Sequence, residues 1–432
     1  MFSQPLAVIK KNKVLGKVNN INWKKLRHAY GTAEDVPDQL LDLLSSDINI
    51  VEDARWDLYN NIFHQGARYE ATPFAIPFLY ELIQSEETLE RESIILMLVH
   101  FALGYEGEYL PDGLDVSKFK NEYSEAEVKM TVSERKESKK IGYSPQAIID
   151  CYEEVKKGIP ILYNLIRHEN KKISRSAIYA LAWFPECAEE SINRINTCLS
   201  SLIEEKDISN ALLSIGLLAR NSNENIEILG LEKYLESNST LVNISAGICL
   251  TKRTLTTRIK NILINGLLSN DELKYLEDVY FNEGEVTGYI SLFLARFGGS
   301  EKEKIVDSLC KILESEIFHQ ALDITKSLLI IINKERKTPI IKTELENLSE
   351  IDLKALTAIL NHGAWKVGPG GYANYILLLK SAGIPDSQEK LRSYLKGEFN
   401  PSFKKVVEKK RSLTRTMWKM TISSIRRLLS SH

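Results

Sequence analysis

The sequence has little proline, glycine and cysteine for its length. Its 432 residues include 12 prolines and 22 glycines, which favours long helices over many short strands joined by turns. The five cysteines form no CxxC pair and leave one over, so their spacing excludes a disulfide framework and a structural zinc site. We expect them to be reduced, structural thiols.

Long apolar runs and catalytic motifs are also missing. No stretch approaches the ~18 uninterrupted apolar residues of a membrane span, and lysines follow the N-terminus too early for a secretory apolar core. There is no HExxH, no GxSxG and no paired metal-ligand spacing, and the glycine-rich run 368–371 lacks the lysine-hydroxyl pair of a P-loop. We therefore expect a cytoplasmic protein that is not an enzyme, with no membrane span, cofactor or metal.

The net charge of −2 conceals an uneven distribution. Residues 1–33 hold seven basic and no acidic side chains, and residues 401–432 hold nine basic side chains and one acidic. These ends carry +7 and +8, so residues 34–400 carry −17. This acidic trunk, residues 34–400, would repel nucleic-acid phosphates along most of its length and attract a basic protein.

One apolar sequence occurs twice, 83 residues apart. Ile-Pro-Phe-Leu-Tyr-Glu-Leu-Ile at 76–83 returns as Ile-Pro-Ile-Leu-Tyr-Asn-Leu-Ile at 159–166, with six of eight positions identical. Self-similarity at a fixed interval is typical of stacked repeats, in which each unit covers the apolar face of the next. At the same offset His100 stands where the second copy has Trp183, which predicts a packed ring. The prolines at the second position of each copy are expected to delay or kink their helices.

Apolar periodicity predicts separate helices at the start of the trunk. A short amphipathic helix is expected over 23–30 and another over roughly 36–44. A longer helix carries an apolar residue at every fourth position from 50 to 62, with Trp56 broadening its apolar surface. We expect that helix to end at Gly66, as its C-cap.

The alternation of charged turn and apolar helix continues to near the end of the chain. It predicts an all-α fold: an α-solenoid of roughly eight to ten stacked HEAT-like helix pairs over residues 22–400. A basic arm (1–21) would precede it, and a basic amphipathic helix (401–432) would follow. Residues 104–143, rich in charge and tyrosine, lack a clean period and are predicted to be one irregular insertion, either functional or mobile. The first helices of the pairs are expected to start near Asp47, Glu86, Glu169, Asp207, Thr240, Glu285, Glu316 and Asp352, and Thr72-Pro73 marks a further start.

Specific residues between positions 22 and 83 resemble a known family. They are Trp23-Lys-Lys-Leu-Arg-His-Ala-Tyr-Gly31, Ala33-Glu-Asp-Val-Pro37, Asn61-Ile-Phe-His-Gln-Gly66, Tyr69-Glu-Ala-Thr72 and Ile76-Pro-Phe-Leu79. Together they are similar to bacterial HEAT-repeat proteins, which are grouped with the HEAT-like repeats of phycobilisome lyases. The resemblance implies an α-solenoid with a protein-binding role and implies no lyase activity.

Two groups of residues are candidates for partner binding. His64, Gln65, Tyr69 and Glu70 could line a pocket at one rim of the solenoid, although turn chemistry and packing explain the same residues. In the C-terminal segment, Trp418 lies in an apolar helical sector that is flanked by basic side chains. That helix could bind a partner or cap the last repeat by covering its apolar side. Its basic flank consists of Arg415, Lys419 and Arg426.

These observations favour a non-enzymatic binding scaffold whose concave acidic groove captures a basic protein, as an immunity or antitoxin-like protein would. The alternative is a nucleic-acid-binding or DNA-repair protein of the HEAT-like type, against which the acidic trunk argues. An enzyme or assembly factor of the bilin-lyase kind has only the repeat type in its favour.

Overall fold

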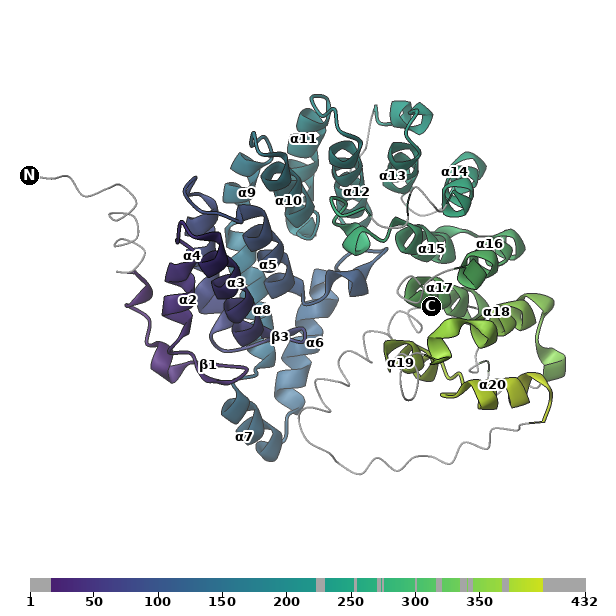
Figure 1. Ribbon diagram of the computed structural model, residues 1–432, viewed down its shortest axis with the longest axis horizontal. Coiled ribbons are helices and arrows are strands. Elements are labelled where there is room, and N and C mark those ends of the chain that lie inside the picture. Colours follow the sequence, from purple (N-terminus) through teal and green to yellow (C-terminus); the bar gives the residue numbers. More distant parts are fainter. Residues whose placement is uncertain are drawn as a thin grey trace, which may run out of the picture. The chain divides into compact units, whose positions relative to one another are not determined.

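The computed structural model is mostly helical, which confirms the predicted all-α class (Figure 1). Its chain divides into two compact units, Met1–Glu227 and Ile228–His432. The structure describes residues 17–222 of the first unit. Of the second it describes residues 230–251, 255–269, 273, 276–299, 301–315, 321–334, 340, 345–366 and 373–398. The described helices include none that is both long and apolar enough to cross a membrane.

The first unit combines α-helices with short 3-10 turns and two small hairpins. In chain order its elements are η1 (Trp23–Lys25), β1 (Arg27–His28), β2 (Gly31–Thr32), α2 (Val36–Asp42), α3 (Ile48–Ile62), β3 (Phe63–His64), β4 (Ala67–Arg68), α4 (Thr72–Ile83), α5 (Arg91–Leu103), η2 (Glu106–Tyr109), α6 (Val116–Lys129), α7 (Val132–Ile141), α8 (Pro145–Lys157), α9 (Ile159–Leu165), α10 (Lys171–Leu181), η3 (Pro185–Cys187), α11 (Ala188–Leu199) and α12 (Glu205–Asn221).

The prediction of a helix over residues 23–30 is wrong. A single 3-10 turn is followed there by the antiparallel hairpin β1–β2, in which Arg27 pairs with Thr32. The expected C-cap at Gly66 is also wrong, because α3 ends at Ile62 and Gly66 lies in the turn of the hairpin β3–β4. Gln65 and Gly66 both have positive φ, 52° and 81°, as the tight turn of a two-residue hairpin loop requires.

The predicted helix start at Thr72 is correct, but its hydroxyl does not cap the helix. Thr72 Oγ1 accepts a hydrogen bond from the Tyr69 N–H and donates one to the Ile62 carbonyl oxygen, 2.6 Å away. The buried hydroxyl therefore joins the end of α3 to the start of α4.

The two copies of the duplicated sequence occupy different helical positions. In the first copy Pro77 lies inside α4, whereas in the second Pro160 lies in the first turn of α9. Tyr80 connects the two copies: it donates a hydrogen bond of 2.7 Å to the Val155 carbonyl oxygen, and its ring lies against Gly158, which directly precedes α9.

Residues 104–143 are largely helical, so the expectation of an irregular insertion is wrong. Asp115 caps α6, and Thr131 with Glu134 forms a capping box that starts α7. Phe119 is the one residue of α6 that is fully buried. Because α6 buries so little of its surface, the sequence shows no apolar stripe there.

In the second unit, alternate helices pack side by side (Figure 1). α15 packs against α17, which packs against α19, while α14 packs against α16, α16 against α18 and α18 against α20. The described elements are η4 (Glu232–Glu236), α13 (Thr240–Leu250), α14 (Thr257–Leu268), η6 (Phe281–Gly284), α15 (Val286–Phe297), α16 (Lys302–Ser315), α17 (Ala321–Asn333), η8 (Leu345–Asn347), α18 (Glu350–Asn361), η9 (Gly363–Lys366), α19 (Ala373–Ser381) and α20 (Gln388–Leu395).

Most predicted starts of the repeat helices coincide with helix starts. Asp47 caps α3 by accepting from the Asn49 N–H, Thr240 is the first residue of α13, and Glu285 directly precedes α15. The predicted starts at Glu169, Asp207 and Asp352 fall within two residues of an observed helix start. The predicted start near Glu86 precedes α5 by five residues. Glu316, the glycine-rich run 368–371, residues 1–16 of the basic arm and the segment 401–432 lie outside the described residues.

Candidate functional site

The hairpin β3–β4 carries the residues that the sequence places at a rim. His64 Nδ1 lies 3.2 Å from the hydroxyl of Tyr30, which belongs to the β1–β2 turn. Gln65 is exposed at the tip of its own turn, and Glu70 is half-buried, with its backbone N–H bonded to the Gly142 carbonyl oxygen. Tyr69 is buried and is therefore not available to a partner. The four residues are thus engaged mainly in turn geometry and packing.

The β1–β2 hairpin is held to α2 and α3 by Asp35. Its carboxylate accepts from His28 Nε2 at 2.9 Å, from Gln39 at 3.1 Å and from Asn61 at 2.8 Å. His28 is 4% exposed and its Nδ1 accepts from the Tyr30 N–H, so the ring proton lies on Nε2. This network holds the backbone of the β1–β2 turn, and the exposed ring of Tyr30 lies edge-on to the ring of His64.

Residues 34–57, which include α2 and α3, concentrate the acidic charge of the trunk. They contain eight carboxylates and one base, Arg55, for a net charge of −7. All eight acidic residues are exposed, whereas Arg55 is half-buried. The net charge of residues 34–400 as a whole hides this cluster, although eight acidic residues within 24 positions are a signal present in the sequence. The acidic residues are Glu34, Asp35, Asp38, Asp42, Asp47, Glu52, Asp53 and Asp57.

The outer face of α3 places an aromatic ring among these carboxylates. Trp56 is 65% exposed, although the sequence placed it on the apolar surface of the helix. The buried stripe consists of Val51, Ala54, Leu58 and Ile62, and Ile50, also expected to be apolar-facing, is 44% exposed. Positions three and four residues apart are neighbours on a helix, so Glu52 and Asp53 flank Trp56 from the preceding turn.

The carboxylates around Trp56 are not used by the fold. Among the described residues, no ion pair or hydrogen bond involves the side chains of Glu52, Asp53 or Asp57. Elsewhere in the acidic segment Glu34 has a cation nearby, with its carboxylate 3.8 Å from Lys24 Nζ. The exposed indole and the carboxylates that the fold does not engage make this face of α3 a candidate contact surface.

A second polar cluster lies inside the first unit, around Glu106. Its carboxylate accepts a hydrogen bond of 2.8 Å from the Tyr179 hydroxyl and lies 3.3 Å from His100 Nε2, while His100 Nδ1 lies 2.9 Å from the Tyr59 hydroxyl. Burial alone would raise the pKa of Glu106, but the hydrogen bond and charge of His100 lower it below its ordinary value. His100 is thus a packed ring that also joins a buried network connecting α3, α5 and α10.

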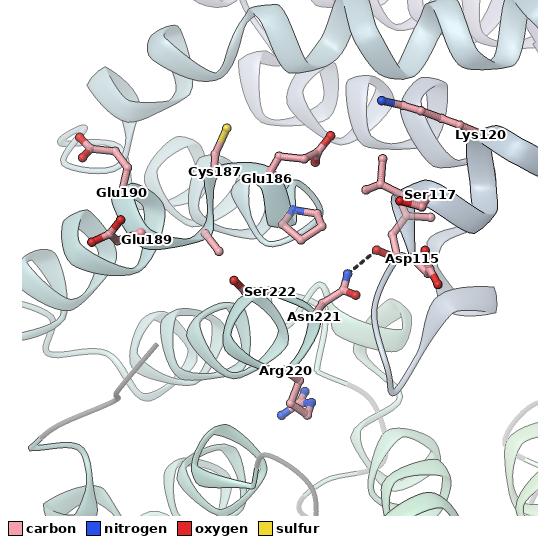
Figure 2. Close-up of a pocket in the computed structure, with 14 residues that line it drawn as sticks. Asp115, Ser117, Lys120, Glu186, Cys187, Glu189, Glu190, Arg220, Asn221 and Ser222 are labelled. Carbon is pink, nitrogen blue, oxygen red and sulfur yellow. Dashed lines mark hydrogen bonds between the residues drawn. The ribbon is translucent and has the colours of Figure 1, made fainter. Parts of the chain in front are cut away.

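A cavity of about 760 Å³ lies between the starts of α6 and α11 and the end of α12 (Figure 2). Three of its polar side chains are engaged by the fold: Glu186 accepts from the Tyr152 hydroxyl at 2.6 Å, Lys120 is paired with Glu153 at 2.5 Å, and Asn221 donates to the Leu114 carbonyl oxygen. Figure 2 shows Arg220 pointing away from the other labelled side chains.

The thiol of Cys187 also lines this cavity. Burial and the neighbouring Glu186 raise its pKa above the ordinary value, which disfavours the nucleophilic thiolate. Within the described part of the chain, no cluster of three or more His, Cys, Asp or Glu side chains could hold a metal ion. The α3 face, whose carboxylates the fold does not engage, is the stronger candidate. Arg415, Trp418, Lys419 and Arg426 lie outside the described residues.

Comparison with known proteins adds little. No family model and no curated protein matches the chain. A crystal structure of an engineered protein matches 92% of this chain and 96% of its own chain at 15% identity, with a TM-score of 0.32. A likeness this weak carries no argument about fold or function.

Proposed function

We propose that this chain is a non-enzymatic protein-binding scaffold that captures a basic protein through the acidic surface of α2 and α3. The observation that carries the proposal is the exposed ring of Trp56 among the unengaged carboxylates of Glu52, Asp53 and Asp57. An immunity or antitoxin-like protein, which neutralises a basic toxin such as a nuclease, is one concrete form of this function.

The chemistry of the surface supports this assignment. Binding energy at protein interfaces concentrates in a few residues, and tryptophan is among the most enriched of them. Surrounding carboxylates steer a cationic partner toward the ring and raise the rate of association. This proposal places the acidic binding surface on the exposed faces of α2 and α3, in place of the concave groove expected from the sequence.

We further propose that the helices form a HEAT-like α-solenoid. The side-by-side packing of alternate helices in the second unit supports this, because each helix pair of a solenoid contacts its neighbours in that way. In the first unit α5 packs against α10 and α10 against α12, which follows the same pattern.

The alternative function is nucleic-acid binding. The basic charge of residues 1–33 and 401–432 favours it, whereas the −7 charge of residues 34–57 opposes it. Gel shift with duplex DNA decides between the two, since a scaffold for a basic protein does not retain DNA at physiological salt.

The test is affinity capture from a lysate at low and high salt, followed by mass spectrometry. The E52Q/D53N/D57N variant removes three charges beside Trp56, and E303Q/E346Q/E389Q removes three exposed charges in the second unit as a matched control. We expect the wild-type chain and the control to retain the same basic proteins at low salt, and the α3 variant to lose them. Recovery of acidic proteins only, or equal capture by both variants, would contradict the proposal.

A further inference from the structure

We infer that the Trp56 site selects arginine over lysine, so that the segment it binds is an arginine-bearing stretch of the basic partner. The inference rests on the proposed function and adds the chemical identity of the group that is recognised. It follows from the placement of one exposed indole and two carboxylates on neighbouring turns of α3.

The geometry of α3 provides two kinds of contact at one point. The ring of Trp56 is 65% exposed, and no aromatic or cationic side chain in the described part of the chain lies against it. Glu52 and Asp53 lie one turn before the ring, on either side of it. One turn after it, the side-chain amide of Asn60 donates a hydrogen bond of 2.9 Å to the Trp56 carbonyl oxygen.

A guanidinium group fits this arrangement better than an ammonium group. Its flat face stacks on an indole while its edge donates parallel hydrogen bonds to a carboxylate. The ammonium of lysine is compact and strongly hydrated, and it cannot make both contacts in one plane. The carboxylates alone would attract either cation, so the selectivity comes from the ring.

The same combination already occurs within this protein. The guanidinium of Arg194 lies over the ring of Tyr163, 4.6 Å from its centroid, and Arg194 Nε donates to a carboxylate oxygen of Glu190, one turn earlier on α11. An aromatic face, a carboxylate and an arginine thus form one compact contact. At Trp56 the ring and the carboxylates are present and the described residues supply no arginine, which leaves that position for a partner.

The test compares fluorescein-labelled nona-arginine and nona-lysine peptides binding to the full chain, by fluorescence anisotropy at low salt. We expect nona-arginine to bind about tenfold more tightly to the wild-type chain, from the combined stacking and bidentate contacts. Trp56→Leu should reduce that ratio to about 1–2 by weakening nona-arginine alone, and Trp56→Phe should give an intermediate ratio. Circular dichroism confirms that each variant is folded.

The outcomes separate the two proposals. Equal affinity of the wild-type chain for both peptides overturns arginine selectivity, as does an equal loss of both peptides in Trp56→Leu. Either result leaves the proposed function in place if E52Q/D53N/D57N still weakens both peptides. Failure of both peptides to bind, or binding that this triple variant does not change, contradicts the proposed function itself.

Discussion

Tyr80 and Gly158 allow a direct test of how the two copies of the duplicated sequence pack. Tyr80 belongs to the first copy, and Gly158 directly precedes the second. A Cβ atom on Gly158 would lie 2.0 to 2.3 Å from ring atoms of Tyr80, far inside van der Waals contact. Because Tyr80 is buried and its hydroxyl is held by the Val155 carbonyl oxygen, the ring cannot swing away. Gly158→Ala should therefore force the two helices apart.

The expected size follows from the cost of overpacking a core. Gly158→Ala should lower the free energy of unfolding by about 1–3 kcal/mol. Tyr80→Leu should cost on the order of 2–4 kcal/mol, because it removes a buried ring and one of the two hydrogen bonds that the Val155 carbonyl oxygen accepts, the other coming from the Gly158 N–H. In the double variant the smaller leucine gives the new methyl group room, so the combined loss should be smaller than the sum by about 1–2 kcal/mol.

The measurement is urea unfolding followed by far-ultraviolet circular dichroism, for both single variants and the double variant. Gly363→Ala is the control, because a Cβ at Gly363 meets no atom within 4 Å, and it should change the unfolding free energy by less than about 0.5 kcal/mol. Additive losses, or a Gly158→Ala variant as stable as the wild-type chain, would refute the close contact between the two copies.

Two further predictions concern buried charge. Asp207→Asn should destabilise the first unit by about 3–5 kcal/mol in thermal unfolding, because it leaves the 6%-exposed Arg175 without the carboxylate 2.7 Å away. Lys157→Ala is the control: it breaks the ion pair of an exposed lysine with Glu154 and should change the unfolding temperature far less. Because the pKa of Glu106 is lowered in the folded state, its ionised carboxylate stabilises the fold above about pH 4.5, and this stability is lost as the pH falls through the folded-state pKa. Glu106→Gln removes the charge that pairs with His100, so this variant should be less stable than the wild-type chain at pH 7 and should lose less stability between pH 5 and pH 3. Parallel curves of unfolding free energy against pH for the two proteins would contradict this prediction.

Helix positions could be predicted well where local chemistry and apolar spacing agree. The helix starts at Asp47 and Thr240 could be predicted because a capping side chain or a change of apolar period can be read from the sequence there. The hairpins could not be predicted from alternation, since each strand has two residues and no period can be read over that length. Gly66 is compatible with a helix C-cap and with a hairpin turn, and the residue types at 65 and 66 do not decide between the two.

The duplicated sequence shows where tertiary context decides. The same Ile-Pro pair opens α9 but lies in the middle of α4, because Thr72 and Pro73 start the first helix earlier along the chain. Proline in a helix interior removes one backbone hydrogen bond, which α4 tolerates in a well-packed setting. Sequence identity between the copies therefore predicted a shared packing surface but not identical helix boundaries.

The candidate site was only partly readable from the residues. The acidic charge of residues 34–57 is explicit in the sequence, whereas the exposure of Trp56 is not. An amphipathic helix with apolar residues at 50, 51, 54, 56, 58 and 62 can bury more than one sector, and the choice depends on what packs against it. In the structure α2 packs against α3, and the buried sector centres on Ala54 and Leu58, which leaves Trp56 on the outside.

The acidic surface also has an energetic cost that points to its use. Asp38 and Asp42 on α2, and Asp53 and Asp57 on α3, are like charges spaced four residues apart, and each such pair destabilises a helix by about 0.2–0.5 kcal/mol. No described ion pair offsets the charges on α3. A cationic partner converts this repulsion into attraction on binding, so the free energy lost by the unbound helices is recovered in the complex. The proposed capture of a basic partner accounts for this pattern, which does not stabilise the chain alone.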